Sequence, residues 1–322
     1  MLLAVLLVTC TLASEVRRDV AYSNVESAGS ALLHRFYSAR CLRARTEERR
    51  RFRELWQPII GDPSFHRLGT LWHTFGDLRV SDRLRAVYVH NPKVGTRSIN
   101  ALLHALDVNV SKWSLPLGGG AVRPSEKHKL ERLRSYKWFT FVRSPKAAML
   151  SGISESVWQL TRPDQKHARA VLRESRVSRR PLTVARGTNC TTAQIEQRTP
   201  PAASDYLQWF LEDVTNLNLL GESAFHAWPQ LTKLDVLPAG QRFDFLGRIE
   251  YFEDDFNELM QLLHTAKVEW ANMPTHSISG PIKASRCGIE LNMSLNTIRQ
   301  LPEKHKVLLS GLLANDEACF LD

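Results

Sequence analysis

The chain has 322 residues, and its 43 Lys and Arg outnumber 33 Asp and Glu, which gives a formal net charge of +10 at pH 7. Its length allows one large hydrophobic core. The positive charge favours an anionic partner, but no zinc-finger, RNA-binding or basic-zipper motif accompanies it, so we expect no nucleic acid as a partner.

The first 13 residues are almost entirely apolar and end in small residues at Ala13 and Ser14. This run is shorter than the roughly 20 residues of a spanning helix and fits a signal peptide, with a truncated type II signal anchor as the alternative. No other long apolar run follows. We therefore expect a protein of the secretory pathway that is either secreted or attached to a membrane through residues 1–13.

Residues 14–80 form a basic region, interpreted as a stem or accessory region, in which residues 43–56 have the pattern of a helix. Arginines are concentrated over residues 40–53, and a second basic stretch covers residues 162–180. Either stretch could line a groove for a polyanionic glycan or form the solvated face of a helix. For the first stretch we favour the solvated face.

Residues 81–270 have the alternating strand and helix patterns of an α/β core with parallel pairing. A short apolar run over residues 86–90 predicts a strand, and apolar residues at helical spacing over 99–106 predict a helix. The sequence PKVGTRS, residues 92–98, joins them. Such a junction suits a phosphate group, because the N–H groups of the first helical turn point outward.

Several residues of this junction have the chemistry of an anion site. Lys93 adds a positive charge, Gly95 allows the backbone to approach a ligand, and Thr96 and Ser98 offer hydroxyl groups. The segment is therefore a candidate anion-binding loop.

A second junction has the same logic. Residues 138–142 predict a buried strand, Arg143 follows it, and Pro145 suits the first position of a helix that carries Ser151 on its second turn. Arginine can grip a phosphate group through two parallel N–H bonds. We expect Arg143 to approach the same ligand as the first junction.

The two junctions, in this order, resemble the phosphosulfate-binding motifs of Golgi carbohydrate sulfotransferases, in particular the chondroitin, dermatan and HNK-1 sulfotransferases. Residues 243–250 and 252–256 resemble the late strand and acid-capped helix of that family, and residues 226–230 resemble its His-aromatic-Pro-Gln stretch. The resemblance covers about residues 84 to 270. It implies a P-loop-like sulfotransferase fold, with a central parallel sheet flanked by helices.

The resemblance also implies an activity, the transfer of a sulfuryl group from 3′-phosphoadenosine 5′-phosphosulfate (PAPS) to a glycan hydroxyl in the Golgi lumen. The acceptor would be a glycosaminoglycan-like polymer or a glycoprotein glycan. Arg143 and Ser151 would hold the 3′-phosphate. The 5′-phosphosulfate would be held by the first junction: Lys93, Val94, Gly95, Thr96, Arg97 and Ser98.

Catalysis needs a cation on the leaving oxygen and a base for the acceptor proton. Lys93 is the candidate cation. The candidate bases are His226, beside Trp228 and Pro229, and His128, in a strongly charged stretch. We favour His226, because its surroundings resemble the family.

Two other functions remain open. A P-loop-like ATP-dependent phosphotransferase would use a similar junction, but a Walker A motif places its Lys after the glycines, whereas Lys93 precedes Gly95. The other is a non-catalytic, secreted glycan-binding protein, for which the basic stretches would matter and Lys93 would not. We expect no metal, because sulfuryl transfer does not require one and no Cys/His cluster is present.

Residues 271–322 form a C-terminal extension with a helix near residues 304–313. Disulfides are expected in an oxidising lumen, and Cys287 with Cys319 is the preferred pair, because both cysteines lie in this extension. Sequons at Asn109, Asn189 and Asn292 could accept glycans or occur by chance.

Overall fold

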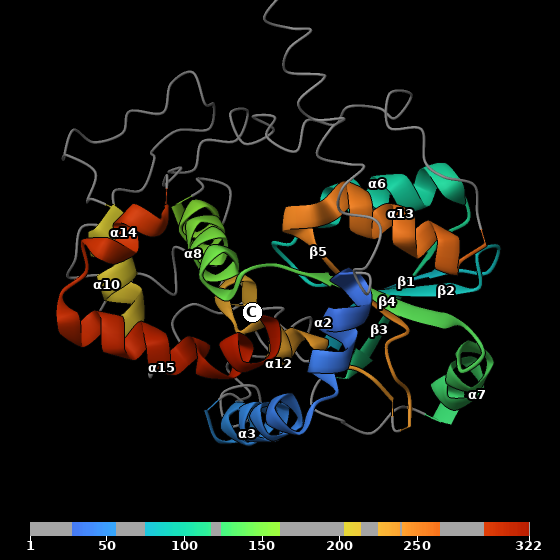
Figure 1. Ribbon diagram of the computed structural model, residues 1–322, viewed down its shortest axis with the longest axis horizontal. Helices are drawn as coiled ribbons and strands as arrows, with labels where there is room; N and C mark the ends of the chain where they lie inside the picture. Colours follow the sequence, from blue (N-terminus) through green and yellow to red (C-terminus); the bar gives the residue numbers. More distant parts are fainter. Residues whose placement is uncertain are drawn as a thin grey trace, which may run out of the picture.

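The computed structural model describes residues 28–55, 75–116, 124–161, 203–213, 225–238, 240–264 and 293–321. Over these residues the protein has an α/β fold, in which helices flank a five-stranded mixed sheet (Figure 1).

The sheet has the strand order β3-β1-β2-β4-β5. β4 pairs in parallel with β2 and β5, whereas β1 pairs antiparallel with β2 and β3. The strands are β1 (Phe75–Ser81), β2 (Ala86–Val89), β3 (Ser111–Pro116), β4 (Lys137–Val142) and β5 (Phe245–Arg248).

The expectation of parallel pairing is thus confirmed for β2, β4 and β5, but the sheet is not parallel throughout. A four-residue turn, residues 82–85, joins β1 to β2. So short a connection can only reverse the chain, because a parallel neighbour needs a crossover of a dozen or more residues. The antiparallel strand β1 lies mostly in the region that the sequence assigned to a stem.

Two apolar clusters cover the two faces of the sheet. Tyr88 and Phe139 face one side, where their rings stack at 5.3 Å and where α6 and α13 pack. Val87 and Trp138, their neighbours along the same strands, face the other side, which α2, α3, α8, α12 and α15 cover. β2 is buried along its whole length, as expected for a central strand covered on both faces.

The helices expected from the sequence are present. Residues 99–106 belong to α6, and the helix expected to begin at Pro145 is α8. Residues 43–55 belong to α3, and residues 304–313 belong to the longer α15. The helices and short 3₁₀ turns are α2 (Ala28–Phe36), α3 (Ala39–Leu55), α6 (Thr96–Leu106), α7 (Pro124–Leu133), α8 (Pro145–Thr161), α10 (Ala203–Asp213), η5 (Phe225–Ala227), α12 (Gln230–Leu234), η6 (Ile249–Tyr251), α13 (Phe252–Leu262), α14 (Leu295–Arg299) and α15 (Glu303–Phe320).

The described part of the basic N-terminal region packs on the same core as the sheet. Leu32 and Phe36 of α2 and Phe52 of α3 are buried in the cluster that also contains Trp138 of β4. In Figure 1, α2 lies close to the sheet and α3 runs along α15 at the lower side of the molecule.

The prediction of a disulfide between Cys287 and Cys319 is wrong, because Cys319 of α15 is bonded to Cys41 of α3. Both cysteines are fully buried where the two helices pack together. The sequence places them 278 residues apart, so only the tertiary fold brings them into contact. Cys287 lies outside the described residues.

None of the helices that the structure describes combines the length and apolar character that a membrane span requires. The leader, residues 1–13, lies outside the described residues.

Candidate functional site

The two candidate anion-binding junctions lie side by side. β2 and β4 are parallel neighbours with Val87 opposite Trp138, so the segments that follow them leave the same edge of the sheet. Asn91, just after β2, donates a hydrogen bond from Nδ2 to the carbonyl oxygen of Phe141 in β4 at 3.1 Å. The structure therefore brings together the two segments that the sequence singled out.

The first junction is a tight loop with two residues in the left-handed region. Lys93 has φ 71° and Gly95 has φ 73°, and the side chain of Val94 between them is fully buried. α6 begins at Thr96, as an anion-binding loop requires. A non-glycine residue with positive φ is strained by roughly 1–2 kcal/mol, so the fold holds Lys93 in a costly conformation.

The contacts of this loop refine two of the expected roles. The sequence predicts that Gly95 lets the backbone approach a ligand. In the structure Gly95 instead makes room for the side chain of Ile249, with which a side chain at residue 95 would collide. The hydroxyl of Thr96 donates to the carbonyl oxygen of Asn91 at 2.8 Å and closes the loop. Arg97 is exposed and Ser98 half-buried at the start of α6, where helix geometry leaves their N–H groups without intrahelical acceptors.

Lys93 forms an ion pair with a carboxylate that the sequence analysis missed. Its Nζ lies 2.6 Å from Oε2 of Glu155, and the two side chains are 17 % and 6 % exposed. Glu155 lies on α8, one turn after Ser151, so these two residues share a face of that helix. The sequence offered one signal for this carboxylate: Glu155 follows the candidate phosphate-binding Ser151 by four residues, which puts both on one face of a helix.

The second junction has the predicted form, since β4 ends at Val142 and α8 begins at Pro145. The backbone of Arg143 is held by Gln230, whose Oε1 accepts the Arg143 N–H at 2.9 Å and whose Nε2 donates to the Arg143 carbonyl at 2.7 Å. The N–H of Ser144 donates to Oε1 of Glu250 at 2.8 Å. A phosphate group at this junction would therefore lie near a carboxylate as well as near Arg143.

His226 lies close enough to Lys93 and Glu155 to interact electrostatically with both. Burial, followed by the positive charge of Lys93, lowers the pKa of His226 to about 3, and the carboxylate of Glu155 acts in the opposite direction. The segment of His226 packs tightly on α8, because a side chain at Gly152 would collide with the His226 carbonyl. The imidazole is consequently neutral at physiological pH.

The other candidate base, His128, lies elsewhere. It is on α7, which precedes the amino end of β4, whereas the two junctions follow the carboxyl ends of β2 and β4. Its side chain is 91 % exposed, with Nδ1 3.8 Å from Glu131 on the same helix. Figure 1 shows α7 and α8 on opposite sides of the sheet region.

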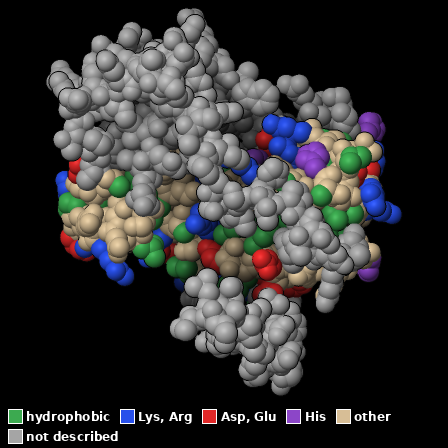
Figure 2. Space-filling view, turned by 90° about the horizontal axis from the view of Figure 1, so that it is seen from above, with side chains coloured by type: hydrophobic (Ala, Val, Ile, Leu, Met, Phe, Trp, Pro, Cys, Tyr) green, Lys and Arg blue, Asp and Glu red, His purple; other side chains and the backbone are tan. Residues whose placement is uncertain are grey.

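The arginines of α3 are largely engaged with neighbouring groups. Arg50 is exposed and pairs with Glu47 and Glu54 of its own helix at 2.5 and 2.6 Å, as on a solvated helix face. On the face seen in Figure 2, blue and red side chains are interspersed over the described residues. The second basic stretch, residues 162–180, lies outside the described residues.

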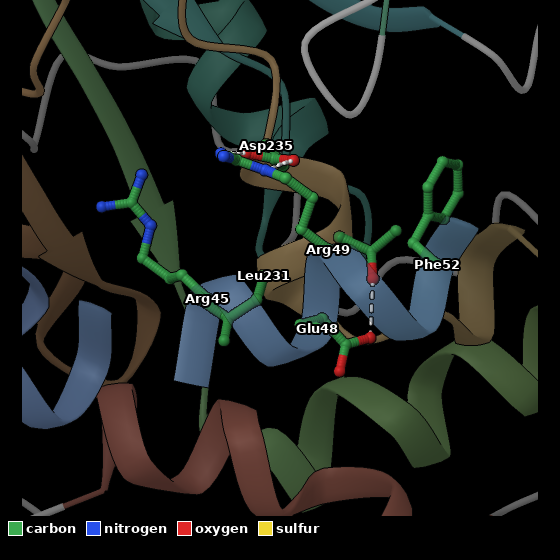
Figure 3. Close-up of a pocket in the computed structure, with 7 residues that line it drawn as sticks. Arg45, Glu48, Arg49, Phe52, Leu231 and Asp235 are labelled. Carbon is green, nitrogen blue, oxygen red and sulfur yellow. Dashed lines mark hydrogen bonds and ion pairs between the residues drawn. The ribbon is translucent and has the colours of Figure 1, made fainter. Parts of the chain in front are cut away.

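A small pocket is separate from the two junctions. It lies between α3 and α12, where Nε of Arg49 donates to Asp235 at 2.8 Å and the guanidinium of Arg45 points away from that pair (Figure 3). None of the site residues predicted from the sequence lines it. Its lining residues are Arg45, Glu48, Arg49, Phe52, Leu231, Thr232 and Asp235.

Among the described residues, no group of three or more His, Cys, Asp or Glu side chains is arranged to hold a metal ion. Comparison of the chain with models of protein families, with curated proteins and with solved structures finds no match in any of the three. The geometry of the two junctions and the sequence motifs are thus the basis for assigning a function.

Proposed function

We propose that the protein is a PAPS-dependent carbohydrate O-sulfotransferase of P-loop-like fold that acts on a glycan in the secretory pathway. The observation that carries the proposal is the position of Lys93. It is held in the left-handed region in the loop that leads into α6, beside the junction that carries Arg143. Strain of this kind is typical of functional sites, where the surrounding fold maintains it.

The donor would bind across both junctions. The N–H groups of the first turn of α6 and the ammonium of Lys93 would receive the 5′-phosphosulfate, and Arg143 with Ser151 would receive the 3′-phosphate. Lys93 would then have to exchange its carboxylate partner, Glu155, for the donor. This exchange retains a charged partner for the lysine, but it leaves the buried carboxylate of Glu155 without its cation, a cost that binding of the donor has to offset.

In the proposed reaction, an oxygen of the acceptor attacks the sulfur and forms the new S–O bond, while the S–O bond to the 5′-phosphate breaks. The bridging oxygen gains negative charge, which Lys93 stabilises, and the nucleotide leaves as 3′-phosphoadenosine 5′-phosphate. The acceptor proton passes to a base. No metal takes part in this scheme.

His226 is the favoured base, because its imidazole is neutral and lies within the electrostatic influence of Lys93. A pKa of about 3 describes a weak base. Because the charge of Lys93 contributes to that low value, a negatively charged donor beside Lys93 would raise the pKa of His226. Donor binding would thus strengthen the base.

The proposal is tested by incubating the purified protein with radiolabelled PAPS and a panel of desulfated glycosaminoglycans and glycoprotein glycans. Transfer of label to a glycan, lost in Lys93→Ala and in Arg143→Ala, is the expected result. Magnesium-dependent turnover of ATP without any use of PAPS would favour a phosphotransferase. Glycan binding that is unchanged in Lys93→Ala, without turnover of PAPS, would indicate a non-catalytic glycan-binding protein.

A further inference from the structure

The side chain of Gln230 joins the two anion-binding junctions. Its Oε1 accepts hydrogen bonds from the Arg143 N–H at 2.9 Å and from Nδ2 of Asn91 at 3.1 Å, while its Nε2 donates to the Arg143 carbonyl at 2.7 Å. The residue is only 1 % exposed. Of the three hydrogen bonds of this buried amide, one therefore goes to Asn91, two residues before Lys93, and two go to the backbone of Arg143.

Asn91 extends this link into the first junction. Besides Gln230, its Nδ2 reaches the carbonyl of Phe141 at 3.1 Å, and its own carbonyl accepts the hydroxyl of Thr96 at 2.8 Å. The loop before α6, the end of β4 and α12 are consequently held together by neutral hydrogen bonds that are buried or partly buried. Such groups fix the geometry of the two junctions without adding a negative charge that would compete with a bound anion for Lys93 or Arg143.

Gln230 is itself held from the C-terminal helix. The N–H groups of Gln230 and Leu231 donate to the two carboxylate oxygens of Asp316 at 2.7 and 2.9 Å, and Asp316 is 1 % exposed. Asp316 lies three residues before Cys319, whose disulfide with Cys41 ties α15 to α3. The amide is thus fixed at both its backbone and its side chain.

We propose that Gln230 is a positioning residue that sets the spacing between the loop of Lys93 and the backbone of Arg143, so that one nucleotide can contact both. This inference rests on the proposed function in so far as the ligand is a 3′,5′-bisphosphorylated nucleotide. The link between the junctions has consequences that can be measured without that ligand.

The test compares Gln230→Met with Thr232→Val. Methionine has a similar length but makes none of the three hydrogen bonds. Thr232 lies on the same short helix, is also buried, and loses one hydrogen bond, to Glu48 at 2.9 Å, which involves neither junction. Gln230→Met should weaken binding of 3′-phosphoadenosine 5′-phosphate at least tenfold, whereas Thr232→Val should change the Kd less than twofold.

Amide hydrogen exchange of the ligand-free proteins provides the second measurement. Exchange over residues 92–99 and 143–151 should rise together in Gln230→Met and stay at the wild-type level in Thr232→Val. If Gln230→Met does not fold, Gln230→Glu, which keeps the oxygen acceptor but loses the bond to the Arg143 carbonyl, should give the same pattern of exchange to a smaller extent.

The outcomes separate the two claims. If the wild-type protein does not bind the nucleotide, the proposed function fails, and the exchange data still decide whether Gln230 couples the junctions. If exchange in the Gln230 variants rises at neither junction or at only one of them, or rises no more than in Thr232→Val, Gln230 is an ordinary core residue and the inference is overturned.

Discussion

The ammonium of Lys93 and the buried carboxylate of Glu155 form a partly buried ion pair at 2.6 Å between the loop after β2 and the third turn of α8. The residues are 62 positions apart in the sequence. The pair links the two junctions through charged side chains, whereas Gln230 links them through neutral hydrogen bonds. It also makes the proposed catalytic lysine part of the stability of the fold.

Lys93→Ala should therefore abolish sulfuryl transfer and also lower the free energy of unfolding, by about 3 kcal/mol, because Glu155 is left buried without its cation. Adding Glu155→Gln should restore much of the stability but no activity. Denaturant unfolding and PAPS turnover measure the two effects. Lys137→Ala is the control, since its ion pair with Asp244 is half-exposed and should be worth less than about 1 kcal/mol. Equal destabilisation by Lys93→Ala and Lys137→Ala would contradict the buried ion pair.

Arg143 should behave differently, because Gln230 holds its backbone and not its side chain. Arg143→Ala is expected to weaken binding of 3′-phosphoadenosine 5′-phosphate by about tenfold or more, the loss of roughly one charge-assisted hydrogen bond, without changing the melting temperature. Arg143→Lys should recover part of the affinity. Arg43→Ala, at an exposed position of α3, serves as the control and should bind normally. Unchanged binding in Arg143→Ala would remove this residue from the site.

His226 predicts a dependence of stability on pH. Burial and Lys93 lower its pKa to about 3 in the folded protein, whereas the unfolded chain takes up the proton near pH 6.5. Between these two pH values the unfolded state therefore binds more protons than the folded state. The contribution of His226 to the stability of the fold is lost as pH falls from about 6.5 toward 3, by up to about 1.4 kcal/mol per pH unit. His226→Asn should flatten this dependence in denaturant titrations. An unchanged slope would show that His226 titrates normally in the fold.

The same histidine links donor binding to base strength. Imidazole signals followed by NMR, with His226→Asn to assign the resonance, should show a pKa that rises when 3′-phosphoadenosine 5′-phosphate is added, because the ligand offsets the charge of Lys93. His128, exposed on α7, provides the internal reference and should not shift. A His226 pKa that is the same with and without saturating nucleotide would exclude it as a base strengthened by the donor.

The disulfide between Cys41 and Cys319 gives a further prediction. Peptide mapping under non-reducing conditions should find these two cysteines in one cross-linked peptide pair, and Cys41→Ser should lower the free energy of unfolding by about 2–5 kcal/mol. Cys287→Ser should leave this pair intact. A cross-link between Cys287 and Cys319 would contradict the packing of α3 against α15.

The features that could be predicted from the sequence are those that depend on residues close together in the chain. The strand before Asn91, the strand before Arg143 and the helices that begin at Thr96 and Pro145 follow from apolar patterns and from turn or helix-start residues within about ten positions. Their meeting at one edge of the sheet follows from parallel pairing.

Contacts between distant parts of the chain could not be predicted in the same way. Glu155 reaches Lys93, Gln230 reaches Arg143, and Cys41 reaches Cys319 across separations of 62, 87 and 278 residues, which no local pattern encodes. β1 was missed because its alternating part is short, with Gly76 and Asp77 near its start, and lies in a region assigned to a stem from its basic composition. His128 was retained as a candidate on its residue type, although the strand predicted at residues 138–142 follows it in the chain and so places it before the amino end of that strand.

The most direct test of the central claim is calorimetric titration of the purified protein with 3′-phosphoadenosine 5′-phosphate, with ATP as competitor and the Lys93→Ala/Glu155→Gln and Arg143→Ala variants alongside. A sulfotransferase site predicts micromolar binding that ATP displaces poorly and that is weakened about tenfold or more in both variants. Absence of binding by well-folded wild-type protein, or equal binding by the variants, would contradict the assignment of the two junctions as a PAPS site.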